Sequence, residues 1–218
     1  MSRARAFHLL TFAVAAFAVV LQLFLVVKGH RPLERDAAPQ LDLGTRIVRF
    51  CSYLTIWSNL LVAWSALSLA AGADRDSRVW RALRLDAVVI CFGGGVVHFF
   101  LLRPHLSHAT AWDQAADTLL HMVVPLLAVI GWVLFGPRRR AEPGDLAPFL
   151  VLPVAWLGYT LVRGAIVDWY PYPFLDVTVH GYPQVVATCV GVAALMFGLA
   201  YAAVRLDARL SRRGQPGS

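Results

Sequence analysis

Six long apolar runs, separated by short polar segments, are the feature that most restricts the fold of this chain. They fall at residues 7–27, 48–71, 85–102, 117–135, 146–167 and 181–204. Each is close to the roughly 20 residues that a helix needs to cross a bilayer. The runs are continuous rather than alternating, which favours helices over a closed barrel. We therefore expect an all-α polytopic membrane protein, a bundle of six transmembrane helices in a single domain over residues 1–218.

The charge balance of the sequence fits the same class of protein. Hydrophobic residues make up 58% of the chain and charged residues 15%, and the charges collect between the apolar runs. The net charge of +7 could indicate nucleic acid, but arginine-rich loops are ordinary in membrane proteins, so we expect no nucleic-acid partner. Four arginines follow one another at intervals of three: Arg75, Arg78, Arg81 and Arg84. On a helix they would form one cationic stripe suited to anionic lipid headgroups.

The distribution of positive charge predicts the orientation of the bundle. If the six runs cross the membrane in turn, 13 lysines and arginines lie on the side of both termini and 7 on the other side. Cytoplasmic loops carry the excess of positive charge in membrane proteins. We therefore expect both termini in the cytoplasm.

Small residues inside the apolar runs favour packing roles. Cys51, Cys91 and Cys189 are odd in number and widely spaced, so they predict neither a disulfide framework nor a zinc site. We expect no metal and no cofactor. Residues 93–95 are three consecutive glycines, which should permit a neighbouring helix to approach closely.

A histidine inside the fourth run is the strongest functional signal in the sequence. His121 is titratable, and such side chains within a membrane span are rare and mark functional sites. With the predicted topology, Thr55 of the second run lies near the same outer end of the bundle, and so do His98 and His180. We expect these four side chains to share one depth, in the outer leaflet.

Spacing within the helices indicates which chemistry these residues could perform. Asp117 precedes His121 by four residues and Asn59 follows Thr55 by four, so each pair shares one helix face. A threonine hydroxyl is a weak nucleophile unless a base removes its proton, and His121 is the best-placed base. Asp117 would orient the imidazole, Asn59 would donate to a developing oxyanion, and His98 is a further supporting residue. In the structural alternative, the hydroxyl bonds to its own helix backbone and the imidazole bridges two helices.

An aromatic segment rich in proline follows the fifth run. It contains Trp169, Tyr172 and Phe174, interleaved with Pro171 and Pro173. The prolines prevent a helix from continuing, and the rings offer apolar area at the membrane surface. The segment is expected to form either an interfacial aromatic belt or a lid over the outer-leaflet site.

Several short motifs occur in an order that resembles a known family. They are Tyr53-Leu54-Thr55 with Asn59-Leu60-Leu61, Leu83-Arg84-Leu85-Asp86, His121 with Val124-Pro125, and Tyr172-Pro173-Phe174-Leu175. This set resembles the androgen-induced transmembrane hydrolase family, whose animal members cleave fatty acid esters of hydroxy fatty acids, and it looks closest to that family's uncharacterised bacterial six-helix relatives. The resemblance implies that Thr55 is the nucleophile and His121 its partner, with Asp117 where animal members have asparagine. It also implies a lipid-like ester substrate and a bacterial cytoplasmic (plasma) membrane, with membrane lipids as partners.

Two other functions are compatible with the same residues. A non-catalytic lipid-binding or transport protein would use the site only to bind, although no internal repeat of the kind common in transporters is present. A haem-binding electron-transfer protein would use His98 and His121 as axial ligands, without a supporting motif. A threonine-dependent hydrolase of lipid esters is the leading hypothesis.

Overall fold

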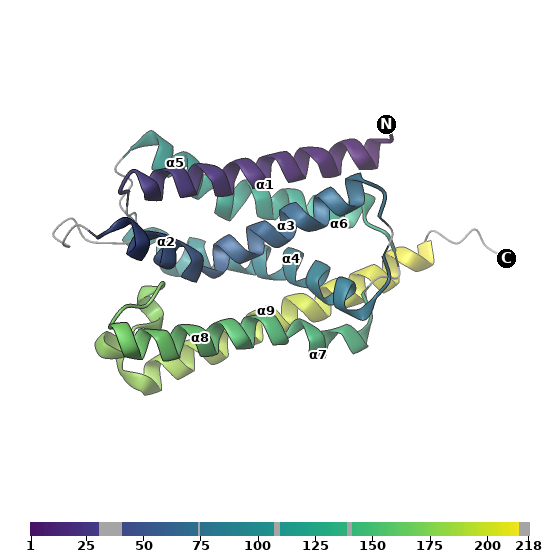
Figure 1. The fold of residues 1–218 in the computed structure, drawn as a ribbon. Coiled ribbons are helices and arrows are strands. Elements are labelled where there is room, and N and C mark those ends of the chain that lie inside the picture. The colour runs from purple at the N-terminus through teal and green to yellow at the C-terminus, as the bar shows by residue number, and fades with distance from the viewer. Residues whose placement is uncertain (31–40, 74, 107–109, 139–140, 214–218) are drawn as a thin grey trace.

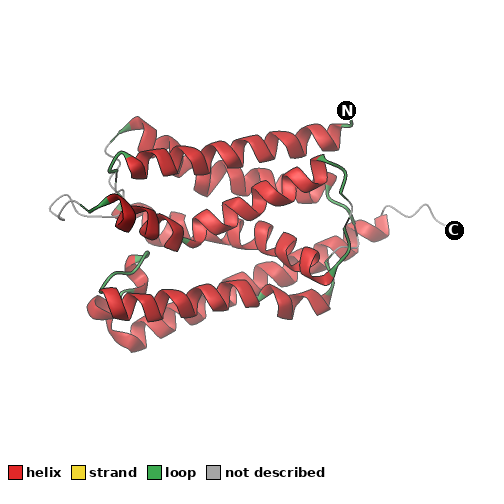
Figure 2. Cartoon of the chain, viewed as in Figure 1, coloured by secondary structure: helices red, strands yellow, loops and turns green. Residues whose placement is uncertain are grey.

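The computed structural model describes residues 1–30, 41–73, 75–106, 110–138 and 141–213, and all regular structure in this part of the chain is helical (Figure 2). The α-helices are α1 (Arg3–Val27), α2 (Leu43–Ser52), α3 (Leu54–Ala70), α4 (Arg78–Val97), α5 (Ala111–Thr118), α6 (Val124–Phe135), α7 (Leu146–Phe149), α8 (Val151–Val167) and α9 (Val177–Arg213). Shorter turns are η1 (His98–Leu102), η2 (Arg103–His105), η3 (Leu119–Val123), η4 (Pro143–Asp145) and η5 (Pro173–Leu175). Four of the counted charges, Arg31, Arg35, Arg139 and Arg140, lie outside the described residues.

The long helices have the length and composition of membrane spans. Five segments qualify: Arg3–Val27, Arg78–Leu102, Ala111–Phe135, Pro143–Val167 and Val177–Arg212. A sixth is present if α2 and α3 count as one span, although these two helices meet at an angle of 68°. The prediction of an all-α chain with membrane-length apolar helices is confirmed, with five or six of them in the described residues.

The second apolar run differs from the single helix predicted over residues 48–71. Helix α2 begins earlier, where the Asp42 carboxylate accepts a hydrogen bond from the backbone at 3.0 Å and caps the helix. The chain then breaks at Tyr53, whose extended backbone (φ −78°, ψ 124°) starts α3 in a new direction. The Tyr53 ring makes edge-on contacts with Trp169 and Tyr172, at centroid distances of 6.0 and 5.6 Å. Because both partners come from the segment after α8, hydropathy along the run could not predict the break.

Helix α4 lies at the centre of the bundle. It packs against α3 and α6 on one side and against α7 and α9 on the other, with α1 and α8 lying further out (Figure 1). One apolar core lies among α1, α3, α4 and α6, and a second lies among α4, α6, α7 and α9. The glycines of α4 allow this packing, since a Cβ on Gly93 would lie 2.5 Å from the Met196 sulfur and one on Gly95 would lie 2.5 Å from the His121 carbonyl oxygen.

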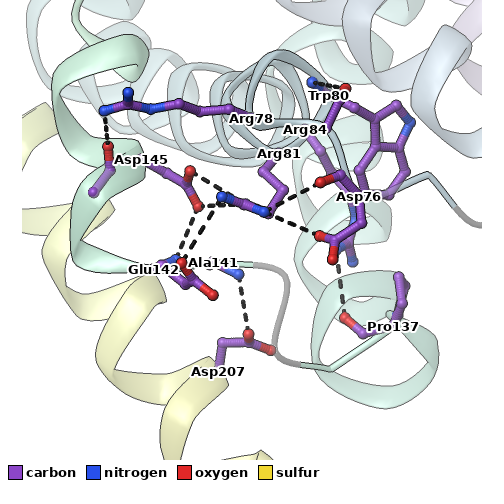
Figure 3. A network of polar contacts seen from close by, with 12 residues as sticks. Asp76, Arg78, Trp80, Arg81, Arg84, Pro137, Ala141, Glu142, Asp145 and Asp207 are labelled. Atoms are coloured by element: carbon purple, nitrogen blue, oxygen red, sulfur yellow. Dashed lines mark hydrogen bonds and ion pairs between the residues drawn. The ribbon is translucent and has the colours of Figure 1, made fainter.

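At the end of the bundle that carries both chain termini (Figure 1), a polar network centred on Arg81 links α4 to neighbouring segments (Figure 3). The Arg81 guanidinium contacts the carboxylates of Asp145 at 3.0 Å and Asp76 at 3.1 Å. Arg84 is only 3% exposed, and its guanidinium lies 4.2 Å from the centre of the Trp132 ring. The expected lipid-facing stripe of four arginines is therefore wrong, because Arg81 and Arg84 turn into the bundle and find their partners within the protein.

Candidate active site

Four segments meet at the opposite end of the bundle, away from the chain termini (Figure 1). They are the first turn of α3, η1 at the end of α4, η3 between α5 and α6, and the loop that contains η5. The structure brings Thr55 and His121 together here, with 3.3 Å between the hydroxyl Oγ1 and the imidazole Nε2. This distance is that of a long hydrogen bond between residues 66 positions apart in the chain.

Both histidines of the site lie in π-helical turns. His98 begins η1, and His121 lies in the middle of η3. Proline at position 125 explains the second turn, because Pro125 has no N–H to donate to the His121 carbonyl four residues earlier. Such wider turns are frequent at functional sites. The Val124-Pro125 motif that followed His121 in the sequence therefore has a structural consequence at the histidine itself.

Asp117 determines which nitrogen of His121 faces the threonine. Nδ1 of His121 lies 3.0 Å from the Asp117 carboxylate and 3.1 Å from the Asp117 backbone carbonyl. Both partners are acceptors, so Nδ1 carries the proton and donates. In the neutral imidazole, Nε2 is then an acceptor for the Thr55 hydroxyl. The expected orienting contact between Asp117 and His121 is present in the structure.

His98 is part of the same cluster. Its ring stacks on His121 with 3.7 Å between centroids and 6° between planes. Its Nε2 lies 3.2 Å from the same Asp117 carboxylate oxygen. One carboxylate thus accepts from two stacked imidazoles, and His98 restrains both Asp117 and His121.

Ligand atoms of His98, Asp117 and His121 lie within 4.8 Å of one another, a separation that a metal ion could bridge. However, imidazole lone pairs lie in the ring plane, and two parallel planes 3.7 Å apart do not direct them to one point. Face-to-face stacking also leaves no space for a macrocycle between the two rings. As arranged, the cluster suits proton sharing better than metal or haem ligation.

Tyr172 enters the site directly, although the sequence indicated only a lid. Its hydroxyl lies 3.3 Å from Thr55 Oγ1 and accepts a hydrogen bond from the Thr55 backbone N–H, also at 3.3 Å. Burial raises the pKa of Tyr172, so the phenol stays neutral and keeps its O–H as a donor. It can therefore donate to an oxygen bound beside Thr55. The sequence signals for this residue were its aromatic, proline-flanked segment and the Tyr172-Pro173-Phe174-Leu175 motif.

The other two residues of the expected lid support Tyr172 and the helix break. Phe174 stacks on Tyr172 with 5.4 Å between centroids and 3° between planes. Trp169 is partly exposed and lies beneath two guanidinium groups, those of Arg49 at 4.7 Å and Arg163 at 5.2 Å. The segment therefore packs over Thr55 and joins α2 to α8.

Asn59 does not face the threonine hydroxyl as the sequence suggested. It is fully buried, and its amide nitrogen donates to the backbone carbonyls of Thr55 at 2.8 Å and Leu120 at 3.3 Å. Both amide hydrogens are thus engaged in joining α3 to η3. Asn59 therefore fixes the backbone of the site, and the hydroxyl that lies beside Thr55 Oγ1 is that of Tyr172.

His180, expected at the same depth, is not part of the cluster. His180 is not one of the described residues that line the two cavities at the site. It precedes Gly181, whose positive φ of 72° interrupts the first turns of α9.

Two cavities meet at the Thr55–His121 pair. One, of about 100 Å³, has a polar rim that includes Arg46, Arg49 and Asp113. The other, of about 150 Å³, extends into the bundle and is almost entirely apolar. The walls of both include five shared residues: Thr55, Leu102, Leu120, His121 and Tyr172. The candidate nucleophile thus lies where a cavity with charged residues in its wall meets a cavity that is almost entirely apolar.

Over the described residues, the chain is helical with five or six membrane-length helices, and a threonine, two histidines and an aspartate cluster at one end. No family model, no curated protein and no solved structure matches the chain.

Proposed function

We propose that this protein is an intramembrane hydrolase of lipid esters, with Thr55 as nucleophile and His121 as general base. The observation that carries this proposal is the directed chain from the Thr55 hydroxyl to His121 Nε2, and from His121 Nδ1 to Asp117. It has the order of nucleophile, base and orienting carboxylate found in hydrolytic triads. The resemblance of the motifs to the androgen-induced transmembrane hydrolase family supports the same roles.

The reaction proceeds through an acyl-enzyme. Thr55 Oγ1 attacks the ester carbonyl while His121 Nε2 takes the hydroxyl proton, and Tyr172 donates to the oxyanion that forms. The tetrahedral intermediate expels the alcohol, which receives the proton from His121. Water then loses a proton to His121 and attacks the acyl group, releasing the carboxylic acid and restoring the threonine.

The two cavities match the two halves of such a substrate. The apolar cavity suits the acyl chain, since the surface of its walls is almost entirely apolar. The chamber with the polar rim suits the alcohol and the water of the second step. A lipid-binding protein without catalytic activity is the second candidate, because the same cavities would hold a lipid whether or not it is cleaved.

Orientation completes the proposal. The 13 basic residues on the side of the termini, against 7 on the other side, favour cytoplasmic termini. The site then lies in the outer leaflet of the cytoplasmic (plasma) membrane of a bacterium, with membrane lipids around it and a lipid ester as substrate.

A fluorophosphonate probe tests the nucleophile. Purified protein in detergent should be labelled at Thr55, as mapped by peptide mass spectrometry, and should hydrolyse a long-chain ester. Thr55→Ala should lose both signals, and Thr55→Ser should retain part of both because the hydroxyl remains. His121→Ala should lose activity almost as completely as Thr55→Ala, because nucleophile and base act as a unit.

The circular dichroism spectrum of each variant serves as the folding control. A folded Thr55→Ala protein that hydrolyses esters at the wild-type rate would exclude the mechanism. A wild-type protein that binds lipid without hydrolysing any ester would favour the second candidate.

A further inference from the structure

A further hollow lies on the side of the bundle, between α3, α4 and α8. It measures about 720 Å³, and its walls come mainly from apolar side chains of these helices, among them Trp57, Val79, Leu83, Val151 and Ala155. We call it the lateral groove. Asp86 also lines it, but at 1% exposure its carboxyl adds almost no polar surface.

The lateral groove faces outward within the membrane-length part of the helices. Trp57, Val79 and Val151 are 46%, 68% and 67% exposed. Val79 is in the first turn of α4, near the chain termini, whereas Trp57 is in the first turn of α3, near the candidate site. The groove therefore extends along much of the bundle. In a bilayer the neighbouring molecules at this depth are lipid chains, and an apolar groove favours a hydrocarbon chain over water.

The groove adjoins the apolar cavity of the candidate site. Leu54 and Trp156 line both hollows, so these two side chains form the partition between them. Leu54 immediately precedes Thr55 in the chain. A hydrocarbon chain that passes this partition reaches the cavity that Thr55 and His121 line.

Polar contacts close the groove at the end nearest the site. The Trp156 indole donates to the Ser52 carbonyl at 2.9 Å, and the Tyr159 and Ser52 hydroxyls lie 3.2 Å apart. These bonds tie α8 to the break between α2 and α3. A lipid acyl chain from the bilayer would therefore enter beside the hydrogen bond between Trp156 and the Ser52 carbonyl, below the polar surface of the membrane.

We propose that the lateral groove binds one acyl chain of a membrane lipid ester and admits it to the apolar cavity between Leu54 and Trp156, an inference that rests on the function proposed above. The substrate reaches Thr55 sideways from the bilayer, without leaving it. Long-chain esters depend on this route, whereas short, water-soluble esters can reach the site through the chamber with the polar rim.

The test fills the groove and compares two esters of one chromophore. Ala155→Trp places a large ring in the groove on an exposed position of α8. Ala165→Trp is the matched control, because Ala165 is also exposed on α8 but lines none of the described hollows. In phosphatidylcholine vesicles, Ala155→Trp should lower the kcat/KM for p-nitrophenyl palmitate roughly tenfold and leave that for p-nitrophenyl acetate within about twofold. Ala165→Trp should leave both unchanged.

A chemical block avoids any effect on folding. In a background with the three native cysteines replaced by alanine, Ala155→Cys is purified, shown to be active, and then alkylated with a bulky maleimide. Alkylation should again suppress palmitate hydrolysis selectively. Palmitate hydrolysis at the unmodified rate after complete alkylation would overturn the lateral route while leaving the proposed function intact. Failure of the wild type to hydrolyse either ester would instead overturn the proposed function, and the route with it.

Discussion

At the scale of single residues, the direction of each hydrogen bond defines what the cluster can do. Two acceptors on Asp117 fix the proton of His121 on Nδ1, which leaves Nε2 to accept from Thr55. The Thr55 N–H donates to the Tyr172 hydroxyl, which frees the phenolic hydrogen for another acceptor. Every polar atom around the hydroxyl of Thr55 is thereby oriented before a substrate binds, which is the condition for electrostatic preorganisation.

Removal of the Tyr172 hydroxyl tests its role as oxyanion donor. Tyr172→Phe keeps the ring that stacks on Phe174 but removes the O–H, and kcat for a short ester should fall roughly 100-fold. The Thr55 N–H also loses its acceptor, so the free energy of unfolding should fall by about 1 kcal/mol. Steady-state kinetics and thermal melts measure the two effects.

Tyr170→Phe is the matched control, because Tyr170 is equally buried in the same segment but lines neither cavity at the site. It should leave kcat unchanged. An unaltered kcat in Tyr172→Phe would assign Tyr172 to packing alone.

At the scale of elements, the site depends on a helix that departs from regular geometry where it touches α4. Pro125 leaves the His121 carbonyl without its helical donor, and η3 widens there. Gly95 of α4 allows that carbonyl to come close, because any Cβ at this position would meet it at 2.5 Å. The depth and direction of His121 therefore follow from a proline on its own helix and a glycine on the neighbouring one.

A pair of alanine substitutions tests this contact. Gly95→Ala should displace η3, lower ester hydrolysis strongly and reduce the free energy of unfolding by about 1–3 kcal/mol through overpacking. Gly198→Ala, on α9, meets nothing within 4 Å and lines none of the described cavities, so it should stabilise α9 by about 0.5–1 kcal/mol with activity retained. Ester hydrolysis and melting temperature report both. Equal behaviour of the two variants would contradict a role for close approach at Gly95.

At the scale of the whole molecule, the two ends of the bundle have different tasks. The end with the termini is held by charge contacts around Arg81 (Figure 3), which join α4 to the segment before α7. The other end holds titratable groups around two cavities and is covered by the aromatic loop after α8. Because the two tasks are separated, one end can contain cavities at the site while the polar contacts at the other end hold the helices together.

Cysteine labelling tests the orientation of these two ends. In a background without native cysteines, Thr178→Cys near the site should react with a membrane-impermeant maleimide in intact cells, because the site end is expected outside. Arg75→Cys, at the end with the termini, should react only after permeabilisation. Both positions are exposed, so accessibility within the fold does not differ. The reverse labelling pattern would place the site in the inner leaflet.

Local sequence determined the helices and the contacts within one helix. Apolar length predicted the membrane-length helices because a bilayer demands satisfied backbone hydrogen bonds over a fixed thickness. The four-residue spacing of Asp117 and His121 predicted their contact, since helical geometry alone places those side chains together. The same rule placed Asn59 on the face of Thr55 but did not predict that its amide donates to the backbone carbonyls of Thr55 and Leu120, because a shared face does not say which nearer acceptors will take the amide hydrogens.

Tertiary structure decided everything that joins distant segments. The 3.3 Å approach of Thr55 to His121, the stacking of His98, the break at Tyr53 and the inward turn of Arg84 all depend on partners from other helices. Hydropathy and spacing describe one helix at a time, so they place residues at a depth and on a face but do not choose the neighbour. Packing of the helices decides which residues become neighbours. Of the four residues expected at one depth, Thr55, His98 and His121 cluster with Asp117, whereas His180 lies outside the cluster.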